Sequence, residues 1–228
     1  IVNEPPQEVR TFEPDDLAGQ MSMQDVETIR EIFHTPLTGS YNWDYDSANA
    51  KIRRLYELGK KFNWNPTADV DWDAPCDMND YPMEASLGAL NGYPKYEALS
   101  PEEKVRFAWK GHAQTMSQFL HGEQGALLVA SQLVSCAPTA DAKLYAASQT
   151  FDEARHVEVF NQYLRQRCGR VYPINKNLKL LIDKVLADER WDLKFIGMQL
   201  IIEGLALAAF GTQVRTTKEP LLKQLVEL

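Results

Sequence analysis

The chain has 228 residues, of which 44% are hydrophobic and 25% are charged, and this composition excludes a disordered chain and suits one sizeable core. The 24 Lys and Arg residues are outnumbered by 32 Asp and Glu residues, so a net charge of −8 disfavours nucleic acid and anionic membranes as partners. Three cysteines without a CxxC pair predict a reducing, cytoplasmic location. No run of 18 apolar residues is present, so we expect no membrane span, and the missing initiator Met suggests a start inside a longer chain.

Residues 1–100 carry frequent turn signals, such as Asn65-Pro66 and Asn91-Gly92. We predict that this region is an irregular, aromatic-rich extension with short helices that wraps around the rest of the chain. One amphipathic helix is expected within it, from Ser47 to Phe62, with Ser47 as the N-cap.

Long helices are predicted over the remaining residues, 101–228. Ser100-Pro101-Glu102-Glu103 is typical of a helix start, and no proline follows until Pro138, so the first helix should cover 101–136. Further helices are expected from Pro138 to Cys168-Gly169, without a break from Asn177 to Gly211, and from Pro220 to the last residue. Helices of about 30 residues are about 45 Å long and favour an antiparallel bundle. The predicted fold class is therefore all-α, a four-helix bundle whose fourth core helix is cut off at Leu228.

A single carboxylate, Glu203, interrupts an otherwise apolar stretch from Phe195 to Phe210. Because the stretch is apolar around the whole helix, we predict that it is buried on every side. Burying an unpaired carboxylate is costly, so Glu203 must be protonated, ion-paired or bound to a cation.

Two other predicted helices supply groups that could join Glu203. Glu153 and His156 are three residues apart and therefore project from one helix face, and Glu123 lies at the edge of an apolar stretch. Carboxylate oxygens with one imidazole suit iron or manganese, and three carboxylates carry more charge than one divalent ion balances. Two metal ions are the more natural occupant. The bundle pattern for such a pair requires a second Glu-x-x-His, which we expect soon after Leu228.

The set Glu123, Asp152-Glu153-x-Arg155-His156 and Glu203 resembles the ferritin-like di-iron carboxylate superfamily, in the oxygenase and oxidase branch that includes ribonucleotide reductase small subunits. The resemblance covers about residues 101–228. It implies that Glu123, Glu153, His156 and Glu203 bind two iron ions or a mixed manganese and iron centre, with no catalytic residue beyond these ligands. It also implies that Asp152 and Arg155 support the ligands by orienting histidines and balancing charge.

Several positions depart from individual subfamilies. Phe160 stands where the reductases usually carry a radical-storing Tyr, and Ala206 and Leu207 stand where bacterial monooxygenases tend to place a Thr. The predicted function is therefore an O2-activating di-iron oxygenase or oxidase of a small organic substrate, supplied with electrons by a ferredoxin or reductase. Other possibilities stay open. One is a ferroxidase or iron-handling protein without organic substrate. Another is a non-catalytic interaction module, or a half-site that a second copy completes across a homodimer interface.

Other notable residues have simpler interpretations. His112 and His121 are expected to be ordinary bundle or surface histidines, and His34 receives no role. The glycines at 197, 204 and 211 recur every seven residues. They indicate close helix packing, with a substrate channel or a helix distortion beside Glu203 as the functional alternatives.

Overall fold

The computed structural model describes residues 39, 43–47, 49–84 and 90–227, which all belong to one compact unit of the chain. The predicted extension over 1–100 therefore falls partly outside the described residues. Among those that are described, the structure is helical, and the only β-type pairing is an isolated bridge between Met83 and Thr217. The predicted all-α class is confirmed.

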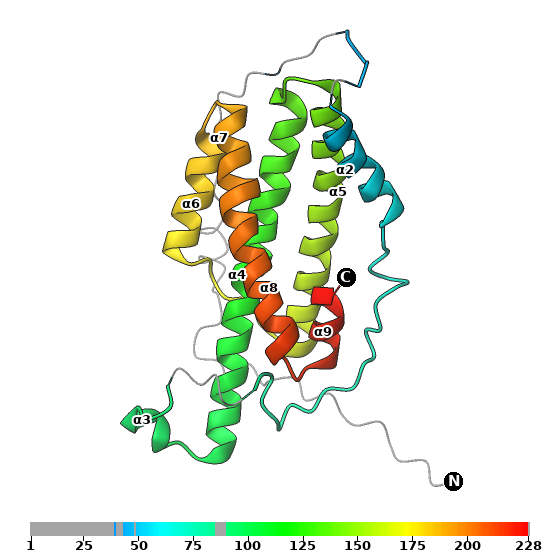
Figure 1. Cartoon of the computed structure of the whole chain (residues 1–228). Coiled ribbons are helices and arrows are strands. Elements are labelled where there is room, and N and C mark those ends of the chain that lie inside the picture. The colour runs from blue at the N-terminus through cyan, green and yellow to red at the C-terminus, as the bar shows by residue number, and fades with distance from the viewer. Residues whose placement is uncertain (1–38, 40–42, 48, 85–89, 228) are drawn as a thin grey trace, which may run out of the picture. The chain divides into compact units, whose positions relative to one another are not determined.

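Two long antiparallel helices, α4 (Pro101–Cys136) and α5 (Ala140–Tyr163), lie side by side at the centre of this unit (Figure 1). Helix α4 begins with a capping box in which the Ser100 hydroxyl accepts from the Glu103 backbone N–H and the Glu103 carboxylate accepts from the Ser100 N–H. A π-helical turn, η3 (Leu164–Cys168), extends α5 to Gly169, whose φ of 66° ends the helix. Both helices follow the predicted bounds.

The predicted unbroken helix over 177–211 is wrong. Helix α6 (Lys176–Ala187) ends, the chain turns at 188–190, and a second helical segment runs through α7 (Trp191–Phe195), the π-helix η4 (Ile196–Ile202) and α8 (Glu203–Thr216). The fully buried Lys194 ammonium donates hydrogen bonds to the carbonyls of Val185 and Leu186 and to the Gln132 side chain. This side chain satisfies the last carbonyls of α6 and so replaces helix continuation.

The prediction that Phe195–Phe210 is buried on every side is also wrong. Met198 and Ile202 are buried, but Leu200, Leu205 and Leu207 are 63%, 64% and 69% exposed. By length and composition alone, the helix Trp191–Thr216 could cross a membrane, with a mean hydropathy of 1.7 in its most apolar window. The sequence-based expectation that no segment qualifies was therefore incorrect.

The hydrophobic core lies where α4, α6 and η4 meet, through Val129, Leu133, Ile182, Leu186 and Met198. Three short helices complete the described part: α2 (Ala50–Lys61) along α5, α3 (Pro94–Glu97), and α9 (Pro220–Glu227) beside α8. Helix α9 starts at Pro220 as predicted.

The N-cap of α2 differs from the prediction. The Asn49 side chain accepts from the backbone N–H groups of Lys51 and Ile52, so Asn49 is the N-cap rather than Ser47. The Ser47 hydroxyl instead donates to the buried Asp141 carboxylate and ties this segment to α5.

Candidate metal centre

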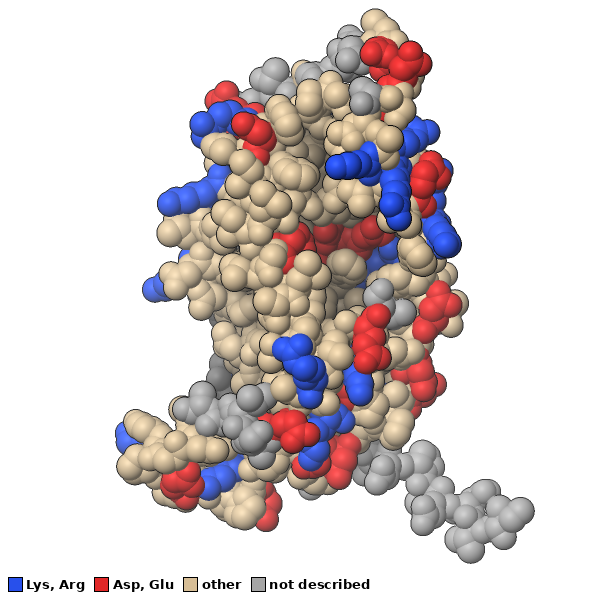
Figure 2. Space-filling view, viewed as in Figure 1, with Lys and Arg blue, Asp and Glu red and all other residues tan. Residues whose placement is uncertain are grey.

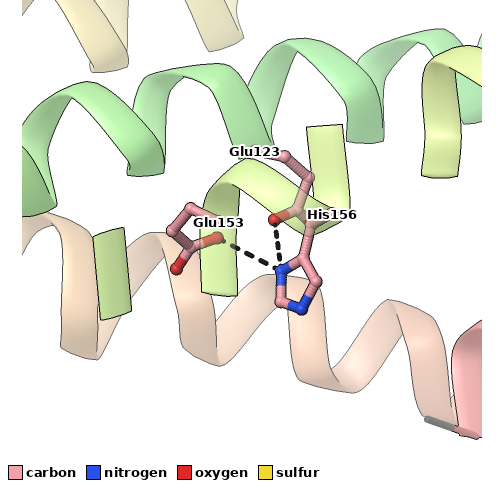
Figure 3. A group of neighbouring side chains, drawn as sticks. All are labelled: Glu123, Glu153 and His156. Carbon is pink, nitrogen blue, oxygen red and sulfur yellow. Dashed lines mark hydrogen bonds and ion pairs between the residues drawn. The ribbon is translucent and has the colours of Figure 1, made fainter. Parts of the chain in front are cut away.

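Three predicted ligands converge between α4 and α5 (Figure 3). Glu123 projects from α4, whereas Glu153 and His156 project from one face of α5. The His156 Nδ1 atom lies 3.1 Å from Glu123 Oε2 and 3.2 Å from Glu153 Oε2. One donor atom from each residue lies within 4.8 Å of the others, so a single ion could contact all three.

The group carries opposing charges in a largely buried place. Both carboxylates are buried, with Glu123 6% and Glu153 4% exposed. Burial alone would lower the pKa of His156, but hydrogen bonds and the negative charges of the two carboxylates outweigh it and raise this pKa to about 10. The imidazole therefore holds a proton between two acidic groups, and a metal ion binding there would displace that proton. Two carboxylates and an imidazole form a donor set that fits iron.

Glu203 lies close to this group but outside it. Burial and the Glu153 charge raise the pKa of Glu203 to about 7, while His156 opposes the rise. Glu203 is the first residue after η4, so the π-helical distortion considered beside it in the sequence is present. The close helix packing expected at the glycines is found at Gly197, where an added Cβ would lie 2.7 Å from the Val185 side chain. It is not found at Gly204, where nothing lies within 4 Å of an added Cβ.

Asp152 and Arg155 are paired, and their contacts lead to an aromatic residue rather than directly to a metal ligand. The Arg155 guanidinium binds the Asp152 carboxylate, donates to the Trp64 carbonyl over 2.6 Å, and lies 4.7 Å from the Trp64 ring centroid. The Trp64 ring in turn stacks on His156, with centroids 6.3 Å apart. The sequence did not indicate this role for Trp64, because it precedes His156 by more than ninety residues.

Gln149 is a second residue that the predicted site omitted. Its side-chain amide donates to Glu153 Oε1 over 3.1 Å from one helical turn earlier. The other carboxylate oxygen of Glu153 is the one near His156. The four-residue spacing between a glutamine and a candidate ligand was the available signal.

The remaining histidines lie elsewhere. His112 is buried and shares a 2.8 Å hydrogen bond with the Tyr163 hydroxyl, and His121 Nε2 lies 2.8 Å from the Tyr172 carbonyl oxygen. Both are structural histidines, as expected. His34 is outside the described residues.

Acidic side chains gather in a recess at mid-height of the bundle, between α5 and α8 (Figure 2). Uncharged surface lies to the left of this recess and below it, and Lys and Arg side chains lie to its upper right. Glu123 and Glu203 also line a half-open cavity of about 240 Å³ between α4, α6 and α8. The acidic groups thus border a space that is otherwise mainly apolar.

A comparison with protein-family models matches residues 46–198 to the family described as p-aminobenzoate N-oxygenase AurF. The match contains Glu123, Glu153 and His156 and ends shortly before Glu203. Searches of curated proteins and of solved structures gave no match. Since the matched region covers more than half of the chain, the chain belongs to the AurF family, and with it to the ferritin-like di-iron oxygenases that its carboxylate and histidine pattern resembles.

Proposed function

We propose that the chain is a di-iron oxygenase that uses O2 to oxidise a small aromatic substrate, with the nitrogen of an arylamine as the atom oxidised. The family supports the oxygenase class, and its name, p-aminobenzoate N-oxygenase, suggests the arylamine. The observation that carries the proposal is the convergence of Glu123, Glu153 and His156 within 4.8 Å, with Glu203 lining the same cavity as Glu123. Bound iron would supply the redox chemistry that O2 activation needs.

The residues of the chain prepare the site in two ways. The Gln149 amide binds one oxygen of Glu153 and leaves the other directed toward His156. The Trp64 ring, held by Arg155, limits rotation of the imidazole. Such supporting contacts fix ligand orientation before the metal arrives.

An organic substrate is favoured over iron handling alone by the cavity beside Glu123 and Glu203. A ferroxidase requires a polar route for iron, whereas this cavity is lined mainly by Phe, Leu, Ile and Ala side chains. Apolar walls exclude water and accommodate an organic molecule.

We further propose a ferredoxin or reductase as the electron donor. We also propose a cytosolic location, which is supported by the three free cysteines.

Anaerobic iron(II) titration of the metal-free protein tests the proposal. Glu153→Gln keeps the side-chain shape but removes a charged ligand, so we expect iron affinity to fall by at least about tenfold. Glu158→Gln changes an exposed residue of the same helix and is the matched control, with unchanged affinity expected. Exposure of the iron-loaded protein to O2 with an arylamine should then give an N-oxygenated product by mass spectrometry. Equal iron affinity in both variants would contradict the proposal.

A further inference from the structure

The cavity between α4, α6 and α8 has a size and a lining that restrict what it can bind. Its volume of about 240 Å³ is below the range of about 300–1,000 Å³ that is usual for drug-sized ligands and suits a single ring with small substituents. Its walls are formed by apolar side chains from α4, α6, η4 and α8, including Phe119, Leu178, Leu181, Ile202 and Ala209.

One wall is a fixed aromatic surface. The centroids of the Phe119 and Phe210 rings lie 4.7 Å apart. The centroid of the Phe160 ring lies 6.1 Å from that of Phe119 and 5.9 Å from that of Phe210. Three mutually packed rings from α4, α5 and α8 leave Phe119 little freedom to move out of the cavity. The wall therefore offers a constant apolar face to a planar ligand.

The cavity offers few polar contacts. Gln118 lines it, but its amide donates to the Gln114 and Pro173 carbonyls and its oxygen accepts from the Asn175 N–H. The other polar side chains in the lining are the carboxylates Glu123 and Glu203. Among the described residues that line the cavity, none is Lys, Arg or His.

We propose that this cavity is the substrate pocket and that it selects an uncharged, single-ring molecule, such as a neutral arylamine, rather than an aminobenzoate anion. A ligand carboxylate held against the apolar walls would lose water without gaining a Lys, Arg or His partner from the described lining. A neutral ring contacts the apolar walls and directs its amine toward Glu123 and Glu203. The direction of the amine rests on the proposed function, whereas the preference for a neutral ring rests only on the lining.

Calorimetric titration at neutral pH tests the preference on the iron(II)-loaded chain kept free of O2 and on the metal-free chain, using 4-methylaniline and 4-aminobenzoate as probes. These two molecules share the ring and the amine and differ in a methyl group against a carboxylate. We expect 4-methylaniline to bind at least about tenfold more tightly. The measurement on the metal-free chain does not depend on iron binding, so either proposal can fail alone.

Two neighbouring substitutions locate the binding. Ala209→Leu fills the cavity and should weaken 4-methylaniline binding at least about tenfold. Ala208→Leu adds the same bulk to the exposed face of α8 and should leave binding unchanged. Circular dichroism checks that both variants remain folded, and unchanged iron binding in Ala209→Leu separates a filled pocket from a damaged helix. Equal or tighter binding of 4-aminobenzoate, no binding of 4-methylaniline, or binding that Ala209→Leu does not reduce would overturn the proposal.

Discussion

Replacing His112 with Gln should remove part of the acid sensitivity of the folded chain. Burial lowers the pKa of the His112 imidazole from 6.5 to about 4. The unfolded chain therefore takes up a proton at this residue near pH 6.5, whereas the folded chain does so only near pH 4, so acidification first favours the unfolded state. The stability that His112 contributes is fully present above pH 6.5 and is lost as the pH falls toward 4.

The size of this effect follows from the pKa difference. Proton linkage predicts that His112 alone lowers the free energy of unfolding by about 2 kcal/mol between about pH 7.5 and about pH 5. Below about pH 4 both states are protonated, and the total loss levels off at about 3 kcal/mol.

Urea unfolding of wild type and His112→Gln at the two pH values measures the contribution directly. Gln retains an amide that can hydrogen-bond the Tyr163 hydroxyl, so the comparison isolates the titrating ring. His121→Gln makes the same substitution at a half-buried position on the same helix and is the matched control. If wild type and His112→Gln lose equal stability on acidification, His112 is not a buried neutral imidazole and the reasoning fails.

Two further predictions concern Lys194, which precedes η4, and Gly197, which lies within η4. Lys194→Met leaves three buried acceptors without a donor and should lower the free energy of unfolding by about 2–4 kcal/mol in urea, while the exposed Lys184→Met should have little effect. Gly197→Ala places a methyl group 2.7 Å from the Val185 side chain. This substitution should lower the free energy of unfolding by about 1–3 kcal/mol and therefore lower the thermal midpoint. Gly204→Ala meets nothing within 4 Å and should leave the midpoint unchanged or raise it; equal midpoints for the two alanine variants would refute the packing argument.

Helix bounds were predictable where short-range signals fix them. Ser100 and Pro101 start α4, and Gly169 ends η3 with the positive φ that glycine accepts readily. The break between α6 and α7 lacks a proline or glycine. It depends on the Lys194 ammonium reaching two carbonyls of the preceding helix and Gln132 of α4, which is a tertiary contact.

The candidate site was predictable where spacing within one helix places residues together, but not where it depends on contacts between distant parts of the chain. Glu153 and His156 were identified because three-residue spacing places them on one helix face, and the structure brings Glu123 to them. Trp64 was missed because only the fold brings it against His156. The ligand roles, Glu203 included, remain predictions for the iron titration. The exposure of Leu200 and Leu205 was missed because an apolar sequence does not reveal which neighbours cover it.

The π-helix η4 changes the angular relation between the two ends of its helix. In a regular α-helix, Lys194 and Glu203 would point about 180° apart, since each residue turns the chain by about 100°. A π-helical bulge typically accommodates one additional residue, and such an insertion within η4 reduces this separation to about 80°. Both side chains can then face inward on one flank of the helix. Removing a single residue from 196–202 would restore ordinary helical winding and turn the Glu203 carboxylate away from Glu153.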